Sequence, residues 1–243
     1  MPVPWLDSDT INFPSTTKAL TEPNGLLAAG GGLSIEWLTE AYRRGIFPWY
    51  QSGQPILWWS PDPRLTLTPA SFVASRSLRK LIRKHRYQIL FDTNFMKVIN
   101  QCALIERGSD GTWITTEMAY AYSELHRAGF AHSVEVWSGD MLVGGLYGVA
   151  VGGMFFGESM FSRMQNASKV ALLHLVDRLK FGNFILLDTQ FLTNHLKTMG
   201  AYEIDQESFV SILKKALKSN SDFYKIGESG ELDTNLYPQS NNY

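Results

Sequence analysis

The chain has 243 residues, of which 44% are hydrophobic and 19% are charged, and its formal net charge is −1. This composition is typical of a soluble globular protein with one large domain or two modest ones, and it excludes a general polycation. No apolar run approaches the ~20 residues of a membrane span. The first residues show no signal peptide, and the single cysteine, Cys102, excludes an intramolecular disulfide. We therefore expect a cytoplasmic protein that does not associate with membranes.

Residues 1–62 are rich in Pro, Gly and Trp, which predicts a small, loop-heavy N-terminal domain. One helix is expected within it, from Ile35 to Arg44. Ser34 is a good N-cap for this helix, and Gly45 is a good residue to follow its last turn.

After Pro63 the pattern changes to alternating helices and strands. We predict strands over 65–68, 87–91, 132–137, 141–149, 153–157, 184–188 and 201–204, and helices over 72–86, 94–105, 115–128, 168–181, 191–199 and 208–217. This order predicts an α/β (α+β) domain over residues 63–226, with a mixed, largely antiparallel sheet. Residues 227–243 turn polar and predict a flexible tail.

The predicted helix over residues 72–86 is strongly basic. No acidic residue occurs between Pro63 and Phe91, and this window also holds Arg64 and Arg86. Five cations fall on one face of the helix: Arg76, Arg79, Lys80, Arg83 and Lys84. A solvated helix face normally mixes both signs of charge, so we favour a polyanionic partner such as nucleic acid, bound without sequence readout.

The segment over residues 152–162 places Glu158 and two serines, Ser159 and Ser162, among Met, Phe and Gly residues. An ionisable group in apolar surroundings is costly unless it has a partner or a task. The segment therefore predicts the wall of a pocket that holds an apolar group beside a polar one. It is no serine-hydrolase elbow, because Phe161 stands where that pattern needs Gly. The five histidines show no metal-ligand spacing, so we expect no metal.

A second polar pair, Asp188 and Gln190, follows the apolar strand over residues 184–188. Side chains two apart on a strand share a face, and sites of open α/β sheets lie at the carboxyl ends of strands. The pair is suited to orient or deprotonate an amine. Asp188 as the N-cap of the following helix is an equally good interpretation of the spacing.

Several tryptophans stand beside Gly or Pro, outside helical periodicity. For Trp49 and Trp113, stacking on a nucleobase and ordinary packing both remain open. For Trp58 and Trp59 we favour packing.

These motifs together resemble the leucyl/phenylalanyl-tRNA–protein transferase family. The similar segments follow the family's order and cover residues 22–27, 44–49, 58–64, 111–115, 132–137, 144–149, 157–162 and 166–169. Two positions depart from the usual pattern: Gly32, where Asp is common, and Thr189, where Cys is common. Neither removes a proposed catalytic group, but Thr189 leaves open how Asp188 and Gln190 are held.

The resemblance implies a small N-terminal domain packed on an acetyltransferase-like (GNAT) domain. It implies transfer of Leu, Phe or, less well, Met from aminoacyl-tRNA to the α-amine of proteins that begin with Arg or Lys, which marks them for degradation. The aminoacyl ester is already activated, so we expect no cofactor. We also expect a monomer.

The resemblance also suggests roles for individual residues. Asp188 and Gln190 would act on the attacking amine, and Glu158 on polar groups of either substrate. Whether Asp188 or the 2′-hydroxyl of the tRNA relays the proton stays open. The remaining assignments are Leu146, Met154, Phe155, Met160 and Leu172 to the aminoacyl pocket, Trp49, Trp113 and Ser162 to the 3′ adenosine, and the basic helix to the acceptor stem.

Two alternatives are weaker. An acetyl-CoA-dependent N-acetyltransferase usually carries a Gly-containing pyrophosphate loop before a helix, whereas residues 163–168 contain no Gly. A non-catalytic RNA-binding module would have no use for Glu158 and Asp188 in apolar surroundings.

Overall fold

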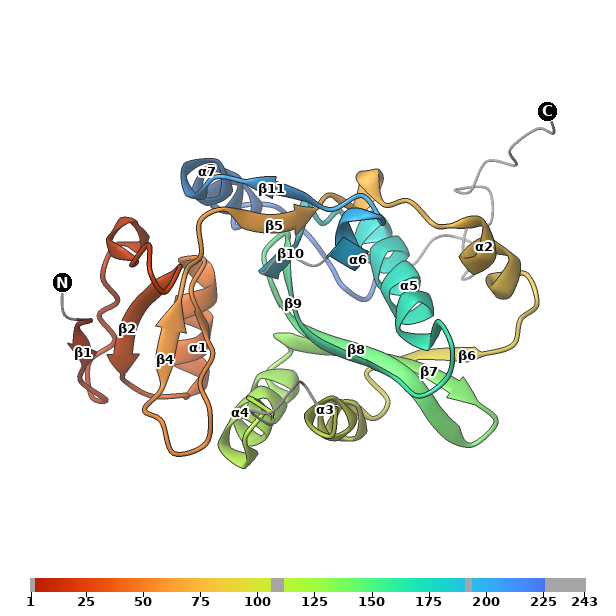
Figure 1. The fold of residues 1–243 in the computed structure, drawn as a ribbon, viewed down its shortest axis with the longest axis horizontal. Helices are drawn as coiled ribbons and strands as arrows, with labels where there is room; N and C mark the ends of the chain where they lie inside the picture. Colours follow the sequence, from red (N-terminus) through yellow and green to blue (C-terminus); the bar gives the residue numbers. More distant parts are fainter. Residues whose placement is uncertain (1–2, 106–111, 191–193, 226–243) are drawn as a thin grey trace.

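Two β-sheets organise the chain in the computed structural model, which describes residues 3–105, 112–190 and 194–225. The smaller sheet has the strand order β1-β2-β4-β3, and the larger has the order β11-β5-β10-β9-β8-β7-β6. Figure 1 shows the smaller sheet at the N-terminal end of the molecule, beside the larger one. The expected flexible tail, residues 227–243, lies outside the described residues.

The smaller sheet was not predicted, because its strands are too short to show an alternating pattern. They are β1 (Trp5–Leu6), β2 (Leu26–Gly30), β3 (Phe47–Pro48) and β4 (Leu57–Trp59). A 3₁₀ turn, η1 (Thr16–Lys18), precedes β2. The predicted helix is confirmed as α1 (Ile35–Arg43), whose N-cap Ser34 accepts a hydrogen bond from the N–H of Trp37. Gly45 follows at a positive φ of 74°, where a side chain would be strained.

The larger sheet confirms the mixed α/β prediction. Its pairs are antiparallel except β9 with β10, which run parallel. Its strands are β5 (Arg64–Leu67), β6 (Gln88–Phe91), β7 (Ala131–Ser138), β8 (Met141–Val151), β9 (Met154–Ser162), β10 (Leu186–Gln190) and β11 (Tyr202–Ile204). Strand β9 is longer than the predicted 153–157, so Glu158 lies within the strand and not beyond it.

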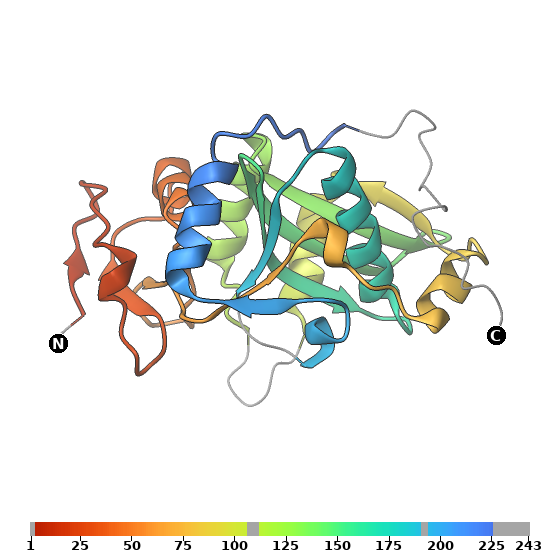
Figure 2. The same ribbon diagram turned by 90° about the horizontal axis from the view of Figure 1, so that it is seen from above.

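Helices cover both faces of the larger sheet (Figures 1 and 2). On one face lie α3 (Phe95–Ala103) and α4 (Thr116–Arg127), and on the other lies α5 (Ala167–Phe181). The remaining helices are η2 (Pro69–Ser71), α2 (Arg76–Ile82), α6 (Asn194–Lys197) and α7 (Gln206–Ala216). Of the helix predicted over residues 191–199, the described part of the chain shows four helical residues, Asn194–Lys197.

The predicted basic helix over residues 72–86 is wrong in its length. Helix α2 begins after Ser75, whose hydroxyl accepts a hydrogen bond from the N–H of Leu78. It ends at Ile82, and His85 takes a left-handed conformation at φ 44°. Residues 76–86, called the basic segment below, therefore form a short helix followed by a turn.

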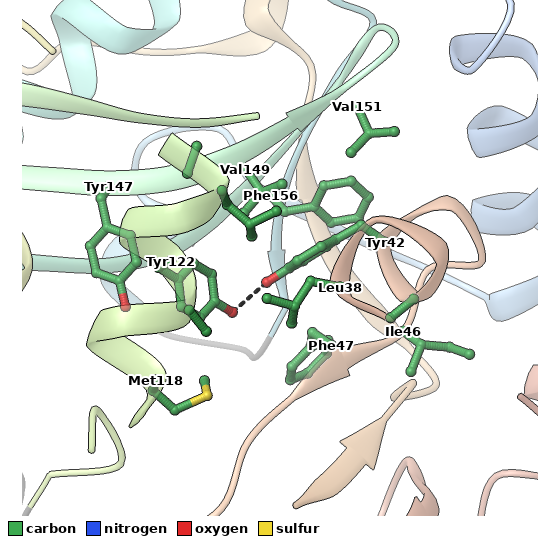
Figure 3. Packing of buried hydrophobic residues seen from close by; sticks show 14 of the residues in the cluster. Leu38, Tyr42, Ile46, Phe47, Met118, Tyr122, Tyr147, Val149, Val151 and Phe156 are labelled. Carbon is green, nitrogen blue, oxygen red and sulfur yellow. Dashed lines mark hydrogen bonds between the residues drawn. The ribbon is translucent and has the colours of Figure 1, made fainter. Parts of the chain in front are cut away.

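The two sheets share one hydrophobic core, and a second core lies under α5. Figure 3 shows where the shared core joins the two parts of the chain. Tyr42 and Phe47 come from the N-terminal part, and Tyr122 and Phe156 come from the larger part. This junction places α1 and β3 against the middle of the large sheet.

Candidate active site

A pocket of about 410 Å³ opens where β9 and β10 separate. The two parallel strands pair only from Met154 to Phe156 on β9 and from Leu186 to Asp188 on β10. Beyond this point their carboxyl ends diverge, which is the usual position of a site in a parallel pair. The volume lies within the range of small-molecule sites. The lining residues are Phe47, Pro48, Trp49, Gln51, Trp113, Leu146, Tyr147, Gly157, Glu158, Ser159, Met160, Leu172, Leu175, Leu187, Thr189, Gln190 and Leu196.

One wall of the pocket is apolar. Three of the five residues assigned to an aminoacyl pocket, Leu146, Met160 and Leu172, line it. Met154 and Phe155 do not, and their assignment is corrected. Both are fully buried, Met154 in the core shared by the two sheets and Phe155 in the core under α5. Leu175, Leu187 and Leu196 take their place.

Glu158 forms the polar wall. It is the extra residue of a β-bulge, because Tyr147 pairs with Ser159 and Gly148 with Gly157, and bulges of this kind re-aim a side chain. The residue is 8% exposed. Its Oε1 and Oε2 lie at hydrogen-bond distance from the hydroxyls of Tyr42 (2.7 Å) and Tyr122 (3.0 Å), respectively.

Burial is the main reason that the pKa of Glu158 is raised to about 7. The hydrogen bonds from Tyr42, Tyr122 and Gln190 lower this pKa, and the charge of Asp188 raises it further. A carboxyl that titrates near neutral pH beside a pocket is a typical feature of a functional site.

Gln190 lies beside Glu158 at the pocket. Its Nε2 donates a hydrogen bond to Oε1 of Glu158 at 3.2 Å. The residue has a positive φ of 61°, and the pairing of β10 with β5 shifts register between Asp188 and Gln190. The simple rule that side chains two apart share a face therefore fails here. Gln190 lines the pocket, whereas Asp188 does not.

Asp188 lies behind the pocket in a buried ion pair with Arg64. Asp188 is 0% exposed and Arg64 1%. Nε of Arg64 lies 3.0 Å from both carboxylate oxygens, and Nη2 lies 2.7 Å from Oδ2. The N–H of Gln190 donates to Oδ1 at 2.8 Å. The carboxylate is thus neither an N-cap nor a pocket-lining base; it fixes the turn that presents Gln190.

From the sequence, Arg64 was interpreted together with the basic residues that follow it. The structure corrects this interpretation. The Arg64 guanidinium lies between the rings of Phe47 and Phe209, 4.9 and 4.6 Å from their centroids, and Nη1 donates to the carbonyl of Gly45 at 3.1 Å. Arg64 therefore ties β10 to the N-terminal part. The sequence feature that could have predicted this role of Arg64 was Asp188, because a carboxylate in a buried strand needs a cation as its partner.

Thr189 stabilises the pocket end of β10, at the position where Cys is common in the family that the sequence resembles. Its hydroxyl donates to the carbonyl of Leu65 at 3.0 Å. This bond links the pocket end of β10 to β5.

Two tryptophans border the pocket. Trp49 is 40% exposed and Trp113 is half-buried, and both are among the lining residues. Trp58 and Trp59 are buried in the core, as predicted. Of these four tryptophans, only the two for which stacking stayed open line the pocket.

Ser162 is not at the pocket. It lies at the end of β9, where its hydroxyl donates to the carbonyl of Met164 (2.8 Å) and accepts from the N–H of Ser168 (3.2 Å). Helix α5 has no capping bond from Asn166. The role of Ser162 in this structure is to order the start of that helix.

The basic segment lies at the end of the molecule opposite the N-terminal sheet, as both ribbon views show. Arg76, Lys80, Arg83 and Lys84 are exposed, and Arg79 is half-buried. Within the described part of the chain, none of the five forms an ion pair with an acidic side chain. The segment therefore offers concentrated positive charge on an open surface.

Within residues 3–105, 112–190 and 194–225, no group of three or more His, Cys, Asp or Glu side chains is placed to hold a metal ion. None of the helices there is long and apolar enough to cross a membrane.

Comparisons with known proteins agree over nearly the whole chain. The family profile described as leucyl/phenylalanyl-tRNA protein transferase matches residues 66–214, and the profile of its N-terminal domain matches residues 31–62. Two similar proteins carry the name leucyl/phenylalanyl-tRNA–protein transferase. One, from Pseudomonas putida, is 58% identical over 88% of this chain and 94% of its own length. The other, from an Azoarcus species, is 56% identical over 88% of this chain and 90% of its own length.

Solved structures resemble the chain only remotely. The structure of L-PGS from Bacillus licheniformis is 11% identical, with a TM-score of 0.39 over 77% of this chain and 64% of that one. No conclusion rests on this similarity.

A mixed α/β fold that places an apolar wall opposite a buried carboxyl and an amide defines a class: an enzyme that holds an apolar group beside a polar reacting centre. The profiles and relatives make this class specific. The chain belongs to the leucyl/phenylalanyl-tRNA protein transferase family, and it is an aminoacyltransferase.

Proposed function

We propose that the enzyme transfers Leu, Phe and, less efficiently, Met from aminoacyl-tRNA to the α-amine of proteins that begin with Arg or Lys, acting in the cytoplasm as a monomer. The modification marks the acceptor protein for degradation. The observation that carries the proposal is the pocket, in which an apolar wall faces Glu158 and Gln190. The Arg or Lys preference and the fate of the product rest on the family resemblance.

The apolar wall suits the aminoacyl side chain. Leu146, Met160 and Leu172 offer aliphatic surface, and the thioether of Met160 adapts to ligands of different shape. A hydrophobic pocket discriminates weakly, by about 1–3 kcal/mol per methylene. Acceptance of several unbranched or γ-branched side chains is therefore expected, with the aromatic ring of Phe among them.

The rim of the pocket suits the 3′ adenosine. Trp49 and Trp113 present indole surface there, and base–aromatic stacking contributes about 1–3 kcal/mol per base. The basic segment would hold the acceptor stem through its phosphates, since its cations have no acidic partners in the described structure.

Positioning is the main catalytic task, because the ester is already activated. Holding amine and ester in contact can contribute about 7–11 kcal/mol to lowering the barrier. The Nε2 of Gln190 is engaged with Glu158, so its carbonyl oxygen is the atom suited to accept a hydrogen bond from the amine. Asp188 acts through Gln190 as a positioning residue.

The reaction balances without an additional reactant. The amine nitrogen bonds to the ester carbonyl carbon, the bond from that carbon to the 3′ oxygen breaks, and one amine proton reaches the 3′ oxygen. Asp188 is fully engaged with Arg64 and the N–H of Gln190. We therefore assign the relay of that proton to the tRNA 2′-hydroxyl.

A transfer assay tests the proposed reaction. Purified enzyme, Phe-tRNA carrying labelled Phe, and two proteins that differ only in beginning with Arg or with Ala are mixed. We expect label to appear on the Arg protein alone, with N-terminal sequencing that reads Phe ahead of Arg. Label on both proteins would refute the acceptor rule. Absence of label while the tRNA still binds would refute the reaction and favour an RNA-binding module.

A further inference from the structure

Three oxygen-bearing groups meet beside the pocket, each on a different element. Tyr42 comes from α1, Tyr122 from α4 and Glu158 from β9. The two hydroxyl oxygens lie 2.5 Å apart, and the dashed line in Figure 3 marks the hydrogen bond between them. The Tyr42 hydroxyl lies 2.7 Å from Oε1 of Glu158, and the Tyr122 hydroxyl lies 3.0 Å from Oε2. All three separations are O–H···O hydrogen-bond distances.

These three contacts need three hydrogens. Burial, and then the charge of Glu158, raise the pKa of Tyr42 and Tyr122 well above the usual value, so each keeps its single hydroxyl hydrogen. An ionised Glu158 supplies none. If both hydroxyls donate to that carboxylate, the 2.5 Å contact between them brings two oxygens together with no hydrogen between. A buried contact of this kind is strongly unfavourable.

We infer that Glu158 keeps its proton well above the pH at which an exposed carboxyl ionises, and that this protonated form closes a ring of three hydrogen bonds with Tyr42 and Tyr122. In this ring Oε2–H donates to the Tyr122 hydroxyl, Tyr122 donates to Tyr42, and Tyr42 donates to Oε1. The Nε2 of Gln190 donates to Oε1 as well, which uses its second lone pair. Each tyrosine hydroxyl then donates once and accepts once.

A second buried carboxylate shows the contrast. Glu135 is 0% exposed, and every contact made to its carboxylate in the described structure comes from a group that brings its own hydrogen. The donors are the hydroxyl of Thr93, the N–H of Asn94, the hydroxyl of Ser133 and the indole N–H of Trp137. The proton count of that cluster closes with the carboxylate ionised, whereas the Glu158 cluster lacks one hydrogen.

The other charged and titratable groups around Glu158 agree with a neutral carboxyl. Asp188 on β10 is a neighbouring negative charge, and its partner Arg64 on β5 is occupied by it. Tyr147 on β8 lies beside Tyr122, with ring centroids 5.6 Å apart. Burial and the charge of Asp188 raise the pKa of Glu158 to about 7.

A neutral Glu158 has a consequence for catalysis that rests on the proposed function. A carboxylate beside the acceptor would stabilise the α-amine as ammonium, which cannot attack the ester. The reference pKa of an α-amine is about 8. A protonated Glu158 adds no negative charge, so the bound amine stays closer to its nucleophilic form.

The protonation state can be measured on the free enzyme without any substrate. The protein is labelled with ¹³C at the Glu side-chain carboxyls and titrated from acid to alkaline pH by NMR, and Glu158→Gln identifies the resonance. We expect this resonance to titrate with a midpoint near 7. A midpoint near the ordinary value of 4.5 would overturn the proposal, whether or not the enzyme transfers amino acids.

Stability gives an independent readout. The folded pKa of Glu158 lies above its unfolded value of 4.5, so the folded protein binds more protons between pH 4.5 and 7. The parent should lose stability relative to Glu158→Gln as pH rises through this window, and the difference should be constant above it. A difference that does not change with pH would contradict the proposal.

Transfer by Glu158→Gln tests the functional part. The glutamine amide can donate to one tyrosine and accept from the other, as the protonated acid does. We expect its kcat to stay within about tenfold of the parent, whereas loss of a required general base costs about 10²–10⁴-fold. A loss of that size would overturn the role of the neutral carboxyl. Failure of the parent itself to transfer would refute the proposed function and leave the NMR result standing.

Discussion

Replacing Arg64 with Met should lower the free energy of unfolding by about 3–5 kcal/mol, because it leaves a buried carboxylate unpaired. The ion pair with Asp188 is fully buried, and the guanidinium also fills the space between Phe47 and Phe209. Asp188→Asn should have a similar cost, since it leaves the guanidinium without its counter-charge. Chemical unfolding followed by tryptophan fluorescence measures both changes.

A double variant separates the structural role of this ion pair from its effect on transfer. Arg64→Met with Asp188→Leu replaces both charges by apolar groups, which is often neutral for stability. We expect stability to return while kcat stays about 10²-fold low, because the N–H of Gln190 loses its acceptor and misplacement of a positioning group costs about that much.

Two controls define the result. Glu40→Gln breaks the exposed pair with Arg44 and should change stability by less than about 1 kcal/mol. Binding of tRNA to the Asp188→Asn protein should stay close to that of the parent, because the basic segment lies elsewhere. A double variant that recovers full transfer would show that Asp188 does not position Gln190.

Replacing the five cations of the basic segment by Gln should weaken tRNA binding steeply. Each phosphate contact adds about 0.7–0.9 to the slope of log affinity against log salt, so loss of five lowers the slope by about 4. The variant changes Arg76, Arg79, Lys80, Arg83 and Lys84. Equilibrium binding of tRNA over a range of salt concentrations measures the slope, and transfer at saturating tRNA should retain the kcat of the parent.

A matched control comes from the carboxyl end of α7, where Lys214, Lys215 and Lys218 are exposed. Replacement of these three lysines by Gln should leave the slope of log affinity against log salt unchanged. If the two variants lower the slope by the same amount for each charge removed, the tRNA is held by the net charge of the protein and not by the basic segment.

The sequence predicted those parts of the site that depend on residue type within a single element. Glu158 among Met and Phe residues predicted a pocket wall, and it lines the pocket. Ser34 and Gly45 predicted the ends of α1 because capping is local chemistry. The roles proposed for these residues in catalysis remain predictions.

The parts that depend on contacts between distant segments were not predictable. The partner of Asp188 is Arg64, 124 residues away, and its position beside other cations suggested an exposed role. The left-handed turn at Gln190 breaks the strand alternation on which the Asp188–Gln190 argument relied. Met154 and Phe155 match the pocket by type, but their side chains are buried in the hydrophobic cores and do not line it.

The most direct test of the account fills the pocket. Met160 is half-buried and lines the pocket, so Met160→Trp should occupy the space assigned to the aminoacyl side chain. The measurement is transfer of Phe from Phe-tRNA by this variant, beside Met141→Trp at an exposed position on β8. We predict a loss of about 10²-fold for Met160→Trp, a typical cost of misplacing a substrate, with unchanged tRNA affinity and no loss for Met141→Trp. Transfer by Met160→Trp at the parental rate would show that the aminoacyl group does not bind between β9 and β10.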